Sequence, residues 1–362
     1  MDLSFTPEQQ ELKDAVRRFC AEEVTAERLA AWEREARGID ARCWQTIAEL
    51  GWLGLGLPTG AGGSGLGLVE VACLLEECGR GLIPRAVISA VRGGWPLAQL
   101  DPNAPELKAL AAGQRTVTLA LDEETCRDPS GYRVCAEQAG DTLRLSGSKW
   151  YVSSGLHADY HIVGARDGGE IGLFLVAAEE AQRKALRTFD GDRQAIARYD
   201  GAPVLRRLSA GGHGAEQLEQ LRREQAALAL AEMLGGMDWA LETTVKYVKE
   251  REQFGQKIGV FQAVQHQVAD MATAYRASHH LAWQAITRVA KGTLQGTDLS
   301  SALAFAGQAF KRVTLTAHHL HGGAGFVVEH PLHYHSERAQ ALCIRYAPEA
   351  AMLGDIASAL LD

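Results

Sequence analysis

The histidines and cysteines are the first residues to consider for chemistry, because both residue types bind metals. His330, His333 and His335 form the pattern H-x-x-H-x-H, but no matching carboxylate or cysteine accompanies them. We therefore interpret this stretch as a polar loop that lines an interface, and we predict no metal site. The seven cysteines are scattered with no C-x-x-C pair. This pattern is typical of reduced cytosolic thiols and not of a disulfide framework or zinc site.

Charge limits the partners that the chain is expected to bind. The formal net charge is −8, which argues against nucleic acid or an anionic membrane surface as the main partner. An anionic ligand would need a local cluster of arginine, lysine or backbone N–H groups. The N-terminal residues lack the basic and apolar regions of a signal peptide, and no run is apolar enough to span a bilayer. We expect a cytoplasmic protein without a membrane segment.

The elements that position such residues follow from length and hydrophobic period. With 362 residues the chain is too long for one small core, so two or three packed layers are expected. Over 1–115 the pattern is helical: Thr6 to Gln9 form a capping box with Pro7 at the first helical position. Further helices are expected around 41–52 and 68–79, separated by a glycine-rich loop at 58–67.

The period changes to two over 116–205, which predicts a sheet. Expected strands cover 116–121, 132–137, 142–153, 160–166 and 170–177, with two weaker ones near 183–189 and 194–199. Short strands with brief connections suggest an antiparallel barrel or sandwich. No G-x-G-x-x-G opens a helix after a strand, so a Rossmann dinucleotide site is not expected.

From 206 to 362 the chain again has a helical period. Apolar residues from Leu230 to Val248 recur at steps of three and four. Further helices are expected over 260–271, 275–292, 297–321 and 347–361. The three regions predict an α+β multi-layer fold, with an N-terminal α-helical domain (1–115), a middle antiparallel β-barrel or sandwich domain (116–205) and a C-terminal four-helix-bundle-like domain (206–362).

Three stretches in this order resemble the acyl-CoA dehydrogenase family. The first is the glycine-rich loop and its helix, PTGAGGSGLGLVE at 58–70 with LLEECGR at 74–80. The second is YVKEREQFGQKIGVFQAVQH at 247–266, similar to the family's Y-x-x-x-R-x-Q-F-G…F-Q signature. The third is HLHGGAGF at 319–326, similar to the family's Q-x-x-G-G-x-G turn. The resemblance runs over nearly the whole chain and implies the same three-layer fold.

The resemblance implies FAD as the cofactor, bound partly across a subunit interface in a dimer of dimers. Arg251 is similar to the arginine that pairs with the FAD pyrophosphate of the neighbouring protomer, and guanidinium geometry suits phosphate oxygens. At Gly322 and Gly323 the chain resembles the turn over which the FAD diphosphate passes, and a helix C-cap there is compatible with that role. The other cofactor-binding candidates in these two stretches are Gln253, Phe254, Ile258, Phe261, Gln262 and His319, the last standing where the family usually has glutamine.

Residues 147–155 (GSKWYVSSG) resemble the family's strand against the isoalloxazine ring. On this register Tyr151 is the aromatic flank of the flavin, and Ser153 is the hydroxyl residue that contacts it. The family's preceding T-E-P-x-x-G-S-D motif is not recognisable in the equivalent stretch, 119–131. In the family that stretch contacts the flavin and the acyl thioester, so its loss puts substrate positioning in doubt.

Dehydrogenation of a thioester between its α and β carbons needs a base for the α-proton and a hydride acceptor, which flavin N5 provides. Most family members carry the base in a Y-E-G-T motif, but here Ala347-Pro348 stand where Glu-Gly would be. Some members place it instead on the long helix before the arginine, a location that falls at Gln225, beside Glu224. We rank Glu224 first; the further candidates are Glu232 and Glu349, and a solvated Glu224 is the competing interpretation.

Three functions therefore stay open. The chain is an acyl-CoA dehydrogenase that uses Glu224 or an equivalent residue, alone or in a heteromer. Alternatively it is a catalytically silent subunit that completes a partner's flavin site, as in a shorter bacterial branch acting on steroid side-chain CoA esters. The third option is a flavin monooxygenase or oxidase of the same fold. The expected partners are an acyl-CoA substrate, an electron-transfer flavoprotein or similar acceptor, and further chains of a homo- or hetero-oligomer.

Overall fold

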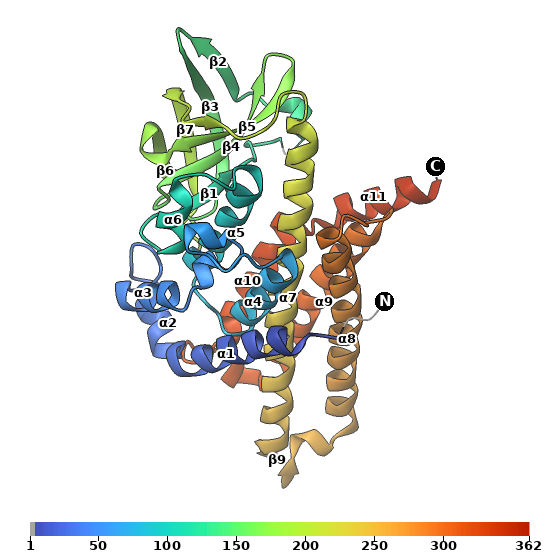
Figure 1. Ribbon diagram of the computed structural model, residues 1–362. Helices are drawn as coiled ribbons and strands as arrows, with labels where there is room; N and C mark the ends of the chain where they lie inside the picture. Colours follow the sequence, from blue (N-terminus) through green and yellow to red (C-terminus); the bar gives the residue numbers. More distant parts are fainter. Residues whose placement is uncertain (1–3, 127, 362) are drawn as a thin grey trace. The chain divides into compact units, whose positions relative to one another are not determined.

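The computed structural model describes residues 4–126 and 128–361 and divides into two compact units. Unit 1 comprises Met1–Ala30, Leu68–Ile83 and Arg223–Asp362, and unit 2 comprises Ala31–Gly67 and Pro84–Arg222. Figure 1 shows helices at both ends of the chain and a sheet between them in sequence. This arrangement confirms the expected α+β fold with helical terminal regions and an antiparallel-rich central sheet.

Unit 1 is helical. Its N-terminal helix α1 (Pro7–Glu23) begins with the predicted capping box, in which Thr6 and Gln9 exchange side chain–backbone hydrogen bonds of 3.0 and 3.3 Å. Helix α1 packs on α4 (Leu68–Arg80), where Lys13 pairs with Glu76 at 2.5 Å and Glu77 at 3.2 Å. Most of unit 1 consists of long helices: α7 (Gly214–Glu250), α8 (Gln262–Ala290), α9 (Asp298–His321), α10 (Leu332–Tyr346) and α11 (Glu349–Leu361).

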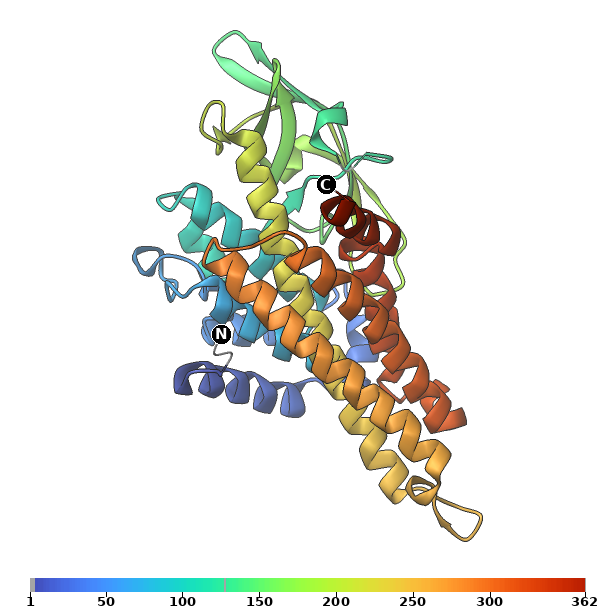
Figure 2. The same ribbon diagram turned by 90° about the vertical axis from the view of Figure 1, so that its right-hand side faces the viewer.

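Figures 1 and 2 show α7, α8 and α9 running side by side for much of their length. Small residues allow the close approach of α4 to α7, because a Cβ at Gly235 would lie 1.7 Å from the Glu76 carbonyl oxygen. The separate helices predicted over 260–271 and 275–292 are one helix, α8, because no glycine or proline interrupts the chain between them.

The prediction of a polar loop at His330–His335 was wrong. Helix α10 begins at Leu332, so His333 and His335 lie in a helix, and His335 is fully buried with its ring stacked on Trp239 at 4.2 Å. The helix was missed because its first turn holds three polar aromatic residues, His333, Tyr334 and His335, instead of an apolar stripe.

Unit 2 holds the sheet, the α-helices α3 (Ala41–Glu49), α5 (Arg85–Leu100) and α6 (Glu106–Ala111), and the first turns of α7. Sequence periodicity did not anticipate α5 and α6. The strands are β1 (Val117–Ala120), β2 (Cys135–Ala139), β3 (Thr142–Val152), β4 (Tyr160–Asp167), β5 (Glu170–Ala177), β6 (Ala181–Ala185), β7 (Ala195–Pro203) and β8 (Arg206–Arg207).

The strands form one sheet in the order β6-β7-β3-β2-β4-β5-β8, with β1 paired to β4. Most pairs are antiparallel, as predicted, but β1 and β2 run parallel to β4. Alternating residues supply two cores: Ile162 and Leu173 belong to a cluster with Leu97 of α5, whereas Val163 and Phe174 pack among other strand residues. Because successive strand residues point to opposite faces, one set of side chains packs against helix α5 and the other set packs against residues of other strands.

Candidate functional site

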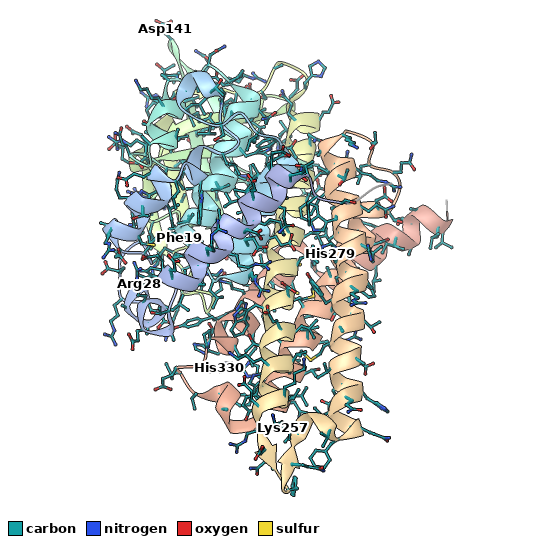
Figure 3. The ribbon with its side chains drawn as sticks, turned by 60° about the horizontal axis from the view of Figure 1, so that its bottom comes forward. Phe19, Arg28, Asp141, Lys257, His279 and His330 are labelled. Atoms are coloured by element: carbon teal, nitrogen blue, oxygen red, sulfur yellow. The ribbon has the colours of Figure 1, made fainter. Side chains whose placement is uncertain are left out.

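The predicted arginine motif lies at the end of α7 in unit 1. The helix ends at Glu250, and the chain turns back through β9 (Glu252–Gln253) and β10 (Gln256–Lys257). The two residues between these strands, Phe254 and Gly255, both have positive φ, 56° and 78°, as a type I′ hairpin requires. Figure 3 shows Lys257 at this end of the α7–α8 pair.

The side chains of this hairpin are presented to solvent. Phe254 is 91% exposed and contacts the Phe261 ring edge-on at 6.1 Å. The Arg251 side chain is exposed and forms no ion pair with any residue that the structure describes, although its backbone is fixed: its N–H donates to Tyr247 O at 2.8 Å and its carbonyl accepts from Ile258 N at 2.9 Å. An anchored backbone with an unpaired guanidinium suits the binding of an anion. The other predicted residues of the motif are exposed or half-buried: Gln253, Ile258 and Gln262.

The predicted glycine turn follows α9. Gly322 is the C-cap of that helix, with φ 56° and an N–H that donates to the carbonyls of His318 and His319. The helix-cap interpretation is therefore confirmed. Gly322 and Gly323 are both exposed, and a Cβ on either would meet no atom within 4 Å. The backbone is thus open on this side, as close approach of a phosphate requires. The His319 ring is exposed too.

Tyr247 joins these two distant segments. Its ring stacks on His321 at 4.4 Å, and its hydroxyl donates to the His321 carbonyl oxygen at 3.3 Å. Tyr247 lies one helical turn before Arg251, and His321 directly precedes Gly322. The fold therefore brings the end of α7 to the end of α9, and the arginine and glycine motifs share one end of unit 1.

The third predicted segment lies at the end of β3 in unit 2. An irregularity in the pairing with β7 falls between Lys149 and Val152, and Tyr151 within it has φ 56°. Positive φ is uncommon for an aromatic residue. The bulge turns Tyr151 outward, and its side chain remains 38% exposed.

Ser153 is held far more tightly than Tyr151. Its hydroxyl donates to Asp192 Oδ2 at 2.8 Å, and its carbonyl oxygen accepts from Thr118 Oγ1 at 2.7 Å and Ser89 Oγ at 3.3 Å. Asp192 is itself 2% exposed and also accepts from the Ser154 N–H at 2.9 Å. This network fixes the strand end that carries both predicted cofactor-contact residues of unit 2.

A buried ion pair that sequence reasoning missed supports the same strand. Lys149 is 0% exposed and its Nζ donates to Glu123 Oε1 at 3.0 Å and to Leu121 O at 3.2 Å. Burial lowers the pKa of Lys149 to about 8, although Glu123 opposes this. Burial would raise the pKa of Glu123, but hydrogen bonds from the N–H groups of Val134 and Arg133, together with Lys149, lower it.

Glu123 lies in the stretch where the family's acidic motif was not recognisable from sequence. Lys149 could have pointed to this pair. It lies four residues after the buried Leu145 on the same strand, so its side chain faces the interior. A buried amine needs a carboxylate partner. The same region holds Tyr132, whose ring lies 3.4 Å from the Lys149 amine and whose hydroxyl accepts from Arg222 at 2.8 Å.

The candidate bases have different environments. Glu224 is half-buried on α7, whereas the neighbouring Gln225 and the more distant Glu232 are buried. Glu349 is exposed at the start of α11 and accepts a hydrogen bond from Gln308. Ala347, where the family motif would have its glutamate, is buried after the end of α10.

Among the described residues, no group of three or more His, Cys, Asp or Glu side chains is placed to hold a metal ion. Across residues 4–126 and 128–361, none of the helices has the length and apolarity needed to cross a membrane.

Comparison with known proteins adds independent information. Residues 6–100 match the model of the acyl-CoA dehydrogenase N-terminal domain, and residues 212–361 match that of the C-terminal domain. The chain is 30% identical to acyl-CoA dehydrogenase FadE27 of Mycobacterium tuberculosis, covering 92% of this chain and 91% of that one.

Two solved structures are similar over almost the full length. The ChsE4–ChsE5 complex from Mycobacterium tuberculosis matches with TM-score 0.91 and 27% identity, covering 100% of this chain and 99% of that chain. A variant of the Tcur3481–Tcur3483 steroid ACAD matches with TM-score 0.89 and 31% identity, covering 98% of each chain.

Proposed function

Because the chain belongs to the acyl-CoA dehydrogenase family, whose members are flavin oxidoreductases acting on CH–CH groups, we propose that it binds FAD and takes part in the α,β-dehydrogenation of an acyl-CoA thioester. The observation that carries this proposal is the junction of the arginine and glycine motifs through Tyr247 and His321. Two exposed segments that each suit phosphate are thereby held together, although 74 residues separate Tyr247 from His321.

In this proposal unit 1 holds the diphosphate. Arg251 supplies a guanidinium that no described carboxylate occupies, and Gly322 and Gly323 allow backbone N–H groups to reach phosphate oxygens. Phe254 and Gln253 lie at the tip of the hairpin, beyond the body of α7, so they suit a contact with a cofactor bound to a neighbouring protomer. The proposed assembly is an oligomer for this reason.

Unit 2 would hold the ring system. Tyr151 offers an exposed aromatic face on a strand end that the Ser153–Asp192 hydrogen bond immobilises. The Ser153 hydroxyl hydrogen is directed to Asp192, so its oxygen is available to accept a hydrogen bond. The flavin, when bound, supplies the hydride acceptor for the reaction.

Glu224 is the proposed base, which would take the α-proton of the thioester on a carboxylate oxygen. Its half-buried position on α7 leaves the carboxylate reachable, unlike the buried Glu232. Ala347 has only a methyl group and cannot take this proton. Glu349 already accepts a hydrogen bond from Gln308, which makes it the weaker candidate.

A second candidate function is that of a partner subunit without its own chemistry. Ala347 in place of the motif glutamate favours it, and so does the likeness to the ChsE4–ChsE5 complex, which is named for two different chains. In that role the hairpin and the glycine turn would complete a flavin site of another chain. Loss of Glu224 would then have no effect on catalysis.

One experiment separates these functions. The chain is expressed alone, its visible spectrum is read for flavin per protomer, and acyl-CoA esters are added anaerobically, including a ring-bearing ester because one neighbour is a steroid ACAD. Bleaching of bound flavin by a thioester supports the dehydrogenase, and Glu224→Gln should then slow bleaching at least about 100-fold. The matched control is Glu219→Gln, an exposed glutamate on the same helix.

Other outcomes contradict the proposal in distinct ways. Absence of flavin from the chain alone, with recovery on co-expression with a second family member, favours the partner subunit. Rapid reaction of the reduced flavin with oxygen would instead favour a monooxygenase or oxidase of this fold. If Glu224→Gln bleaches at the unaltered rate, Glu224 is not the base.

A further inference from the structure

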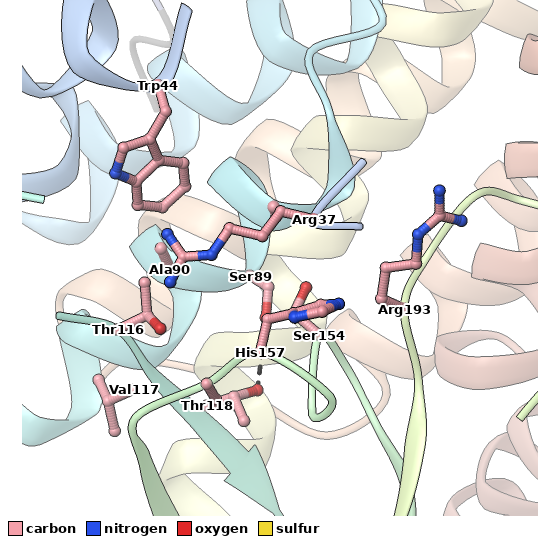
Figure 4. Close-up of a pocket in the computed structure, with 12 residues that line it drawn as sticks. Arg37, Trp44, Ser89, Ala90, Thr116, Val117, Thr118, Ser154, His157 and Arg193 are labelled. Carbon is pink, nitrogen blue, oxygen red and sulfur yellow. Dashed lines mark hydrogen bonds between the residues drawn. The ribbon is translucent and has the colours of Figure 1, made fainter. Parts of the chain in front are cut away.

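A depression in unit 2, away from the motifs above in sequence, gathers positive charge. It is formed by residues near α3, by α5, by β1 and by the segment after β3 (Figure 4). Its cavity volume is about 20 Å³, which is room for about one water molecule, so it can receive one polar group of a ligand and not a whole molecule. The polar side chains that line it are Arg37, Ser89, Thr116, Thr118, Ser154, His157 and Arg193.

Arg37 is the most available cation of this pocket. Its guanidinium carbon lies 5.4 Å from the Trp44 ring centroid, and it forms no ion pair with any residue in the described part of the chain. The Trp44 indole N–H is already used, donating to Gly113 O at 2.8 Å. The ring therefore orients the guanidinium through a cation–π contact without neutralising its charge.

Arg193 also lines the pocket, and Arg183 bonds the carbonyl of the lining residue Ala158; the hydrogen bonds of both arginines go to backbone carbonyls. Arg193 donates to the carbonyl oxygens of Glu33 and Glu35 at 2.7 and 3.0 Å. Arg183 donates to the carbonyls of Leu156 and Ala158 at 3.0 and 3.3 Å. Backbone carbonyls satisfy the N–H groups but leave the positive charge uncompensated.

The field of these cations reaches His157. Burial lowers the pKa of His157, and Arg37, Arg183 and Arg193 lower it further, while a hydrogen bond to the Ala36 backbone raises it. Two carboxylates are bonded to this wall. Asp192 is 2% exposed and accepts from the backbone of Ser154 and from hydroxyls. Asp159 accepts from the backbone and hydroxyl of Thr116 at 2.8 and 3.2 Å and is already paired with Arg115 at 2.7 Å. The opening of the pocket thus presents cations and hydroxyls.

We propose that this pocket binds the oxyanion group of a small molecule, a phosphate or a carboxylate, with Arg37 as its principal ligand and His157 and Ser154 beside it. Guanidinium forks match both oxyanions, and hydroxyls add further donors. In a chain of net charge −8, Arg37 and Arg193 line one depression, and Arg183 acts on the same His157; the mutual repulsion of these cations is otherwise a cost.

Occupation of the pocket is linked to the strand end that carries Ser153. Ser89 lines the pocket and lies 3.3 Å from Thr118 Oγ1, and both hydroxyls bond the Ser153 carbonyl oxygen. A bound oxyanion that recruits Ser89 would loosen one of these bonds. The site itself does not depend on the proposed function, because no residue of the pocket is a predicted flavin contact.

The test is a calorimetric titration of the full chain at constant ionic strength with inorganic phosphate, pyrophosphate and glutarate in turn, and chloride as the blank. Saturable binding of one of the oxyanions is expected, weakened about tenfold or more by Arg37→Gln and less by Arg37→Lys. Arg34→Gln, which changes an exposed arginine outside the pocket, is the matched control and should leave Kd unchanged.

Each outcome of the titrations supports or contradicts the proposed oxyanion site. Binding of phosphate or pyrophosphate but not glutarate identifies a phosphate site, and the reverse identifies a carboxylate site. Heat no greater than that of chloride for all three, or equal Kd values for the native chain and Arg37→Gln, would overturn the proposal. Circular dichroism of the variants guards against misfolding, and His157→Asn provides a second variant that should also weaken binding. Flavin content is not part of the readout, so failure here is distinct from failure of the proposed function.

Discussion

The predicted cofactor contacts of the two units are built in opposite ways. In unit 1, Arg251, Phe254 and Gly322 are exposed, and their side chains or open backbone have few internal partners. In unit 2, the segment around Ser153 is tied by hydrogen bonds to Asp192 and Thr118 and by the nearby buried pair of Lys149 and Glu123. The first group is therefore available to contact another molecule, whereas the second has its geometry set by the fold. Substitutions should therefore separate binding from stability.

The largest expected effect on stability is that of Lys149→Met. Removal of the amine leaves Glu123 buried without its cation, which typically costs about 3–5 kcal/mol of unfolding free energy. Urea unfolding measures the change, and Lys184→Met, at an exposed site on β6, is the control. A loss below about 1 kcal/mol would mean that the two backbone N–H donors suffice for Glu123.

Ser153→Ala should have the next largest effect. It removes a hydrogen bond to the buried Asp192 carboxylate, which is worth about 1.5–3 kcal/mol. Ser148→Ala on the same strand is the comparison, since that hydroxyl has no hydrogen-bond partner among residues 4–126 and 128–361. Equal unfolding free energies for the two variants would remove the distinction drawn between the units.

Acidification should destabilise both units through buried histidines. Burial lowers the pKa of His161 to about 3 and that of His335 well below its ordinary value of 6.5. The unfolded chain binds these protons first, so stability is full above pH 6.5 and falls as pH decreases toward the folded-state values, by up to about 1.4 kcal/mol per pH unit for each histidine. Chemical unfolding between pH 7.5 and 5 checks this, and His335→Asn should flatten the slope. A slope unchanged in that variant would contradict the assignment.

A substitution at the tip of the β9–β10 hairpin should raise the unfolding free energy instead of lowering it. Phe254 has φ 56°, and the left-handed region costs about 1 kcal/mol for such residues but suits asparagine before glycine. Phe254→Asn should therefore raise the unfolding free energy by about 0.5–1 kcal/mol while weakening any contact made by the ring. Lower stability in this variant would show that the packing on Phe261 outweighs the strain.

Arg251→Gln should have the smallest effect on stability, within about 0.5 kcal/mol, because the side chain is exposed and unpaired among described residues. Flavin bound per protomer should nevertheless fall at least about tenfold if Arg251 holds a phosphate. Absorbance of the purified variant measures this, with Arg251→Lys retaining part of the binding. Full flavin content in Arg251→Gln would exclude Arg251 from the site.

Sequence reasoning succeeded where the pattern is local. The capping box at Thr6, the strands of unit 2 and the C-cap at Gly322 follow from a few adjacent residues. It failed where burial involves polar residues. Helix α10 was missed because His335 is buried against Trp239, and Glu123 was missed because its partner Lys149 lies 26 residues away. Tertiary contacts, not local propensity, decide such positions.

The pocket around Arg37 was also beyond sequence reasoning. Its lining residues come from segments as far apart as Arg37 and Arg193, and the charge of each arginine alone suggests an ordinary solvated side chain. Only the fold shows that the hydrogen bonds of Arg193 go to carbonyl oxygens. The identity of a base on α7 depends in the same way on which residue faces the substrate, since adjacent helix positions point about 100° apart.

Protease cleavage at the exposed aromatic tip of the hairpin can be used to measure assembly of the protein. Loop tips with accessible side chains are preferred sites of nicking, and a chymotrypsin-type enzyme cleaves after aromatic residues such as Phe254. If the hairpin reaches into a neighbouring protomer, the rate of cleavage after Phe254 should fall as protein concentration rises. The cut thus offers a measure of assembly that needs neither flavin nor substrate.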